Sequence, residues 1–135
     1  MRFVDTNVLL YFVSLSPVDV SKRSRAEDVL RGHDLALSVQ VLQEFYTQAT
    51  RPTRRDRLTD ADARDLVLGW TRYPVQALTT SILFAALDIK ARHRFSYWDS
   101  AIIAAALALD CDTLLTEDMS HGQTVDGLTI INPFL

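Results

Sequence analysis

Short apolar runs alternate along this chain with longer amphipathic segments, a pattern typical of strands followed by helices. The runs expected to form strands are residues 2–5, 35–37, 75–78, 113–115 and 128–131. The segments expected to form helices are residues 6–14, 18–31, 39–50, 59–72, 80–93 and 96–109. Strands that alternate with helices indicate a parallel sheet covered by helices. We therefore predict an α/β fold: one three-layer α/β/α domain over residues 1–135 with a central, mostly parallel sheet flanked by helices.

Composition fits a soluble globular domain, because 48% of the 135 residues are hydrophobic and 23% are charged. The net charge of −3 argues against a protein that coats nucleic acid, which would usually be basic. It does not exclude an enzyme that cuts nucleic acid through a bound metal ion, since the cation supplies the positive charge.

The cysteines, the histidines and the apolar runs indicate the cellular compartment and exclude some kinds of site. The single Cys111 cannot form an internal disulfide, which indicates a reduced, cytoplasmic environment. His33, His93 and His121 are far apart in sequence, which argues against a zinc site. The apolar run 101–109 is about half of the ~20 residues that cross a bilayer, so no membrane association is expected.

Four carboxylates carry the best clue to function. Asp5 directly follows the first expected strand, and Asp118 comes just after the strand at 113–115. In open α/β sheets, ligands bind at the carboxyl ends of the strands. Glu44 and Asp99 lie on helices that Ser38 and Ser96 should cap near the same edge. Clustered carboxylates repel one another unless a cation neutralises them, and oxygen-only ligands favour Mg²⁺ or Mn²⁺.

Each acid also has a structural interpretation when it is taken alone. Asp5 is a good helix N-cap, and Asp99 in the first turn of its helix complements the helix dipole. Glu44 falls on the polar side of its helix, where a solvated side chain is the default. Asp118 could cap the segment that follows it. The metal-site hypothesis therefore depends on all four acids lying together.

With these residues in view, the chain resembles the PIN-domain ribonucleases, and among them the VapC toxins of bacterial toxin–antitoxin pairs. The resemblance covers essentially the whole length, and no acidic position departs from the pattern. Its motifs are Asp5-Thr6-Asn7, then Glu44, then Ser96-Tyr97-Trp98-Asp99-Ser100-Ala101-Ile102-Ile103-Ala104, then Leu115-Thr116-Glu117-Asp118, and the tail from His121-Gly122-Gln123 to Ile130-Ile131-Asn132-Pro133-Phe134.

The resemblance implies a metal-dependent endoribonuclease that is held inactive by a VapB-type antitoxin and that forms a homodimer. It implies Mg²⁺ or Mn²⁺ as cofactor and RNA as substrate. Asp5 and Asp99 would be direct metal ligands. Glu44 and Asp118 would complete the catalytic cluster, through water or a second ion, and help position the attacking water. Asn7 and Thr116 would give polar support.

Two basic groups are candidate partner contacts. Arg51, Arg54, Arg55 and Arg57 lie in an expected loop around Pro52 and favour RNA phosphate binding. The second group, Lys90 to Arg94, ends a helix, where cations complement the dipole. Either group could instead meet an acidic antitoxin segment.

Two other classes remain as alternatives. A non-catalytic RNA- or protein-binding module on the same scaffold would bind without cleaving, and the four intact acids argue against it. A haloacid-dehalogenase-like phosphatase also places an acid after its first strand, but that chemistry needs a second Asp two residues later. Position 7 is Asn, which discounts the phosphatase strongly.

Overall fold

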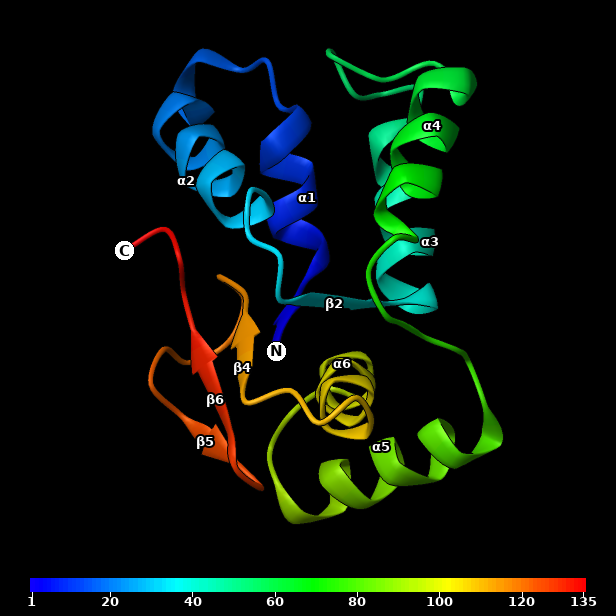
Figure 1. Ribbon diagram of the computed structural model, residues 1–135, viewed down its shortest axis with the longest axis vertical. Coiled ribbons are helices and arrows are strands. Elements are labelled where there is room, and N and C mark those ends of the chain that lie inside the picture. The colour runs from blue at the N-terminus through cyan, green and yellow to red at the C-terminus, as the bar shows by residue number, and fades with distance from the viewer.

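The computed structural model describes residues 1–135 and contains one six-stranded sheet with helices around it (Figure 1). The strands run in the spatial order β3-β2-β1-β4-β6-β5, and every neighbouring pair is parallel except β5 with β6. The predicted α/β fold is therefore confirmed. The strands are β1 Arg2–Val4, β2 Leu35–Ser38, β3 Val75–Gln76, β4 Thr113–Leu115, β5 Thr124–Val125 and β6 Leu128–Ile131.

The helices cover this sheet and pack against one another. Helix α6 contacts β2, β3, β4 and β6, and α5 packs along α6, while α1 packs against α2 and α3. In Figure 1, α1 to α4 lie on one side of β2, and α5 and α6 lie on the other. The helices are α1 Thr6–Val13, α2 Val20–Leu30, α3 Val39–Ala49, α4 Asp60–Trp70, α5 Thr80–Arg92 and α6 Tyr97–Ala108, with a 3₁₀ turn at Pro17–Asp19 before α2.

The two strands that precede the predicted acids are direct neighbours. Strands β1 and β4 are parallel, with Val4 opposite Leu115, and the Asp5 amide donates to the Leu115 carbonyl at 3.1 Å. Asp5 and Thr116 therefore leave the sheet side by side at one edge. This is the arrangement that the parallel-sheet prediction required.

The core lies between the sheet and its helices. Phe3, Leu37, Leu114 and Ile130 fill it from the strands, and Phe45 and Ile103 fill it from α3 and α6. Helix α6 is buried from Ser100 to Ala106, as its apolar sequence predicted. Trp98, near the start of this helix, is exposed, in contrast to the buried residues that follow it.

Two expectations about strands were wrong. The strand expected at 75–78 has only two residues, Val75 and Gln76, which pair with the end of β2. Strand β5 was missed, although Asp126-Gly127 between β5 and β6 is a hairpin signal. Both turn residues have positive φ (49° and 89°), which such a two-residue turn requires. None of the helices has the length and apolar character needed to cross a membrane.

Candidate metal and nucleic-acid site

Asp5 is fixed where β1 ends, and it is buried, with 6% of its surface exposed. One carboxylate oxygen, Oδ1, accepts the Thr6 amide at 2.7 Å, and the other, Oδ2, accepts the Thr116 hydroxyl at 2.8 Å. Burial raises its pKa to about 6, with Asp118 and Glu44 adding to the effect, while the two hydrogen bonds oppose it. Asp5 is thus the N-cap of α1, and its burial disfavours the charged form of its carboxylate.

Glu44 is not the solvated helical residue that its position on α3 suggested. Its side chain is partly buried, and it accepts hydrogen bonds from Thr6 Oγ1 at 2.9 Å and from Gln40 Nε2 at 3.1 Å. Gln40 is one helical turn earlier on α3, and Thr6 is the first residue of α1. The two donors direct the carboxylate toward Asp5.

Asp99 lies in the first turn of α6, which begins with the predicted cap. Ser96 Oγ accepts the Asp99 amide at 3.1 Å. The Asp99 side chain is partly buried, and burial, together with the nearby Asp118 and Glu44, raises its pKa. The first turn of α6 is therefore capped by Ser96 and also places the Asp99 carboxylate at the edge of the sheet.

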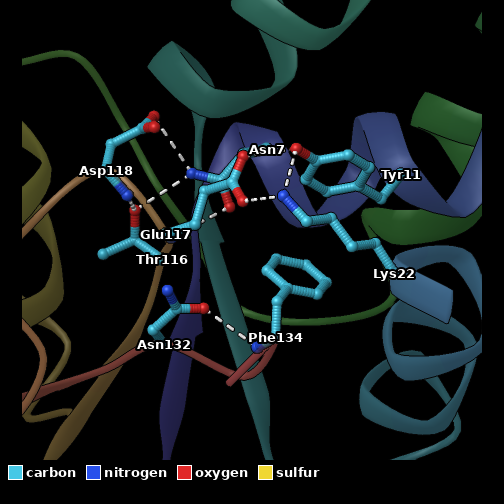
Figure 2. A network of polar contacts seen from close by, with 8 residues as sticks. All are labelled: Asn7, Tyr11, Lys22, Thr116, Glu117, Asp118, Asn132 and Phe134. Atoms are coloured by element: carbon cyan, nitrogen blue, oxygen red, sulfur yellow. Dashed lines mark hydrogen bonds and ion pairs between the residues drawn. The ribbon is translucent and has the colours of Figure 1, made fainter. Parts of the chain in front are cut away.

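Asp118 is exposed, and its carboxylate is held by Asn7 of α1. Asn7 Nδ2 donates to Thr116 Oγ1 at 3.0 Å and to Asp118 Oδ2 at 3.1 Å. Figure 2 shows Asn7 reaching from α1 across to both residues. Thr116 Oγ1 also accepts the Asp118 amide at 3.1 Å. The two residues predicted as polar support thus connect Asp5 with Asp118.

All four predicted acids line one open cavity of about 390 Å³. Asn7 and Arg54 also line it, whereas Thr116 lies behind its wall and reaches it through Asp5 and Asp118. None of the four acids takes part in an ion pair. Four carboxylates that line one space, none of them paired with a cationic side chain, make a region of negative potential.

The donor set fits a hard divalent cation. No group of three or more acidic, His or Cys side chains converges closely enough to hold one ion on its own. Mg²⁺ does not require such a cage, because it keeps several waters and uses one or two carboxylates. The buried Asp5 and the partly buried Asp99 would supply these. A bound ion would stabilise their charged forms, which burial disfavours.

Only one of the four predicted RNA-binding arginines reaches this cavity. Arg54 lines it, and Arg54 Nε lies 3.1 Å from Asp56 Oδ1, although the N–H is not aimed along a hydrogen bond. Arg51, Arg55 and Arg57 are exposed on the same loop but do not line it.

Several other residues belong to the site, although no role was predicted for them from the sequence. Glu117 and Asp19 add two more acids to the cavity wall, together with Trp98 and Tyr11. Glu117 accepts from Tyr11 OH at 2.5 Å and from Lys22 Nζ at 2.8 Å (Figure 2). The spacing of Gln40 and Glu44, four residues apart on a helix, was a usable signal. No sequence pattern connects Lys22 with Glu117.

Comparison with known proteins assigns the family. Residues 2–124 match the PIN domain family model, and the chain belongs to this family. No curated protein sequence matches it significantly.

Solved structures that share the fold include the following three. A toxin–antitoxin complex from Klebsiella pneumoniae is 16% identical, with 98% of each chain covered and a TM-score of 0.72. The Mycobacterium tuberculosis VapC20, a sarcin–ricin-loop-cleaving toxin, is 19% identical over 84% of this chain and 87% of its own, with a TM-score of 0.66. The DNA-bound VapBC of Salmonella typhimurium is 18% identical over 96% of this chain and 95% of its own, with a TM-score of 0.63.

Proposed function

We propose that this PIN-domain protein is a Mg²⁺- or Mn²⁺-dependent endoribonuclease that acts as the toxin of a type II toxin–antitoxin pair. The observation that carries the proposal is the set of four unpaired carboxylates, Asp5, Glu44, Asp99 and Asp118, around one cavity at the edge of the sheet. Burial of Asp5 without a cationic partner has no structural benefit, because a neutral cap would serve α1 equally well.

Each polar residue then has a task. Asp5 and Asp99 would hold the ion directly. Glu44, oriented by Thr6 and Gln40, and Asp118, oriented by Asn7, accept protons from water molecules in the cavity and orient one for attack on phosphorus. Thr116 keeps the Asp5 carboxylate turned toward the cavity. The ion, when bound, supplies positive charge that lowers the pKa of water and stabilises negative charge on the phosphate.

Arg54 is the first candidate for contact with the RNA backbone. Its place on the wall of the acidic cavity would let its guanidinium bind a phosphate next to the one attacked. Arg51, Arg55 and Arg57 would extend this contact along the loop. They would add affinity without base specificity.

The toxin role is supported by the fold shared with toxins of toxin–antitoxin complexes. We further propose a VapB-type antitoxin as partner, a homodimer, and a cytoplasmic location. Two apolar surfaces are compatible with such partners. One is a groove of about 1070 Å³ between α3 and α4, and the other is the face of α5 that exposes Leu83, Phe84 and Leu87.

The cellular test is to map new RNA 5′ ends after expression of wild type and of Asp5→Asn. We expect growth arrest and discrete new ends with wild type, and neither with Asp5→Asn at equal protein level. Co-expression of a small DNA-binding protein encoded next to the toxin should relieve the arrest. Full growth arrest by a folded Asp5→Asn variant would contradict the proposal.

A further inference from the structure

Trp98 is a large aromatic side chain that the fold leaves in water. Its side chain is 67% exposed, although it precedes the most buried stretch of α6. The other tryptophan, Trp70, is only 4% exposed and packs edge-on against Phe45 at 4.8 Å between ring centroids. Single exposed apolar residues are common on protein surfaces, so exposure alone assigns nothing to Trp98.

The location of Trp98 distinguishes it from the other exposed apolar residues. It lines the acidic cavity and directly precedes Asp99, one of the two proposed metal ligands. None of the exposed leucines, valines or Phe84 lines this cavity. An aromatic side chain in the lining of a cavity that binds a phosphodiester is available to stack on a base of the same strand.

The structure also holds Trp98 in place. Gln40 Nε2 donates to the Trp98 carbonyl at 3.4 Å and to Glu44 Oε1 at 3.1 Å, so one amide connects the residue with the acidic cluster. The indole packs edge-on against Tyr97, with ring centroids 5.1 Å apart. The hydrogen bond holds the Trp98 backbone and Tyr97 restricts the indole, and a restricted side chain loses little entropy when a second ring stacks on it.

Positive charge flanks the acids on two sides. A second depression, of about 450 Å³, shares Asp99, Glu117 and Asp118 with the acidic cavity and is lined by Arg94 and Phe95. Arg94 forms no ion pair, and Arg54 lies in the first cavity. A strand that passes from Arg54 across the acids to Arg94 could place phosphates on both arginines and a base on Trp98.

We propose that the Trp98 indole is a substrate contact of this site and stacks on an unpaired base of the bound RNA. This inference rests on the proposed nuclease function and adds a specificity-determining residue to it. In a duplex, both faces of each base are already stacked on neighbouring bases. A single strand can turn one base onto an aromatic ring, and such stacking tolerates any base.

Tryptophan fluorescence gives a direct test, because Trp98 is the only tryptophan left in a Trp70→Phe variant. The probes are oligo(U) and the same strand annealed to oligo(A), with Ca²⁺ in place of Mg²⁺ to occupy oxygen ligands without the geometry that Mg²⁺ imposes. A gel confirms that the strand stays intact. We expect oligo(U) to quench Trp98 and the duplex to leave it nearly unchanged. If Trp70→Phe does not fold, the wild-type signal that is missing in Trp98→Phe gives the same information.

Affinity for oligo(U), measured by filter binding, completes the test. Trp98→Ala should weaken binding by between about 5-fold and about 150-fold, since stacking on an aromatic side chain is worth ~1–3 kcal/mol per base. Trp98→Tyr should restore most of it, and Leu78→Ala, which changes an exposed apolar residue outside both the cavity and the α3–α4 groove, should change nothing.

The possible outcomes separate this inference from the nuclease proposal. Quenching by oligo(U) in a protein that cleaves no RNA would support stacking and reject the proposed catalysis. Cleavage by wild type, with unchanged affinity in Trp98→Ala and no quenching, would overturn stacking and leave the nuclease intact. Equal quenching by single strand and duplex would also overturn it. So would a Trp98 signal that depends on protein concentration without RNA, since a second copy would then cover the indole.

Discussion

The Thr116 hydroxyl donates a 2.8 Å hydrogen bond to Asp5 Oδ2, joining the ends of two adjacent strands that are 111 residues apart in sequence. Both residues are buried, and the same hydroxyl oxygen accepts hydrogen bonds from Asn7 Nδ2 and the Asp118 amide. One side chain thus orients the buried carboxylate and fixes the loop that carries the exposed one.

Replacement of Thr116 by Val should therefore be costly although the shape is conserved. It would leave a buried carboxylate oxygen without its donor and two N–H donors without their acceptor. We expect a loss of about 1–3 kcal/mol in the free energy of unfolding, measured by urea denaturation. Thr116→Ser keeps the hydroxyl, so its loss of about 0.8 kcal/mol for the missing methyl should be smaller than the loss in the Val variant. Equal stability of the Val and Ser variants would show that the hydroxyl is not needed.

Asp5 should make the protein less stable as pH rises. Its pKa is about 6 in the folded state and about 3.9 in an unfolded chain, so the folded state binds the proton more tightly. The stabilisation is fully present below about pH 4 and is lost as pH rises through about 6. It amounts to roughly 3 kcal/mol for a shift of about two units.

Asp99, whose pKa is also raised, contributes with the same sign. Denaturant titrations in EDTA between about pH 4 and about pH 8 should show a steeper fall in stability for wild type than for Asp5→Asn. Parallel pH profiles of the two proteins would mean that Asp5 does not carry the effect.

A divalent cation should stabilise the folded protein because it offsets the charge on the buried acids. At a concentration about 100 times its dissociation constant, Mg²⁺ would add roughly 2.7 kcal/mol to the free energy of unfolding. Thermal unfolding with and without Mg²⁺ should show this increase in wild type and not in Asp5→Asn or Asp99→Asn. Asp88→Asn, which removes an exposed acid on α5 that does not line the cavity, should respond like wild type. The same response to Na⁺ would indicate general screening rather than binding.

Lys22 and Glu117 should be coupled only weakly in stability. Their ion pair is 2.8 Å long, but its side chains are 41% and 21% exposed, so solvent screens it. A double-mutant cycle with Lys22→Met and Glu117→Gln should give a coupling energy of about 0.2–1 kcal/mol that falls at high salt. A coupling well above this range, unaffected by salt, would mean that the pair is buried more deeply than the exposure of its side chains indicates.

The placement of the acids could be predicted where it follows from backbone rules. Parallel strands end at one edge, which brought Asp5 and Asp118 together. The serine caps at Ser38 and Ser96 set the start of α3 and α6, so that Asp99 lies near that edge. These features depend on local chemistry and strand direction, and both can be inferred from a sequence.

Other features depend on contacts between distant side chains. Helical periodicity separates polar from apolar faces, but it does not distinguish a face in water from one that lines a polar cavity, which is why Glu44 was expected to be solvated. The conformation of the loop at 51–57 has no periodic signal, so nothing indicated that Arg54 alone would reach the acids. Lys22 meets Glu117 only because α2 folds back against α1.

The claim that the four acids form a metal-dependent nuclease site is tested most directly by cleavage of RNA with purified protein. Wild type, Asp99→Asn and the control Asp88→Asn should be compared with Mg²⁺ and with EDTA, after circular dichroism has shown that all three are folded. We predict cleavage by wild type and Asp88→Asn only when Mg²⁺ is present. Asp99→Asn should lose more than the ~10- to 100-fold that removal of an outer-shell residue costs. Cleavage that persists in EDTA, or in Asp99→Asn at the wild-type rate, would contradict the claim.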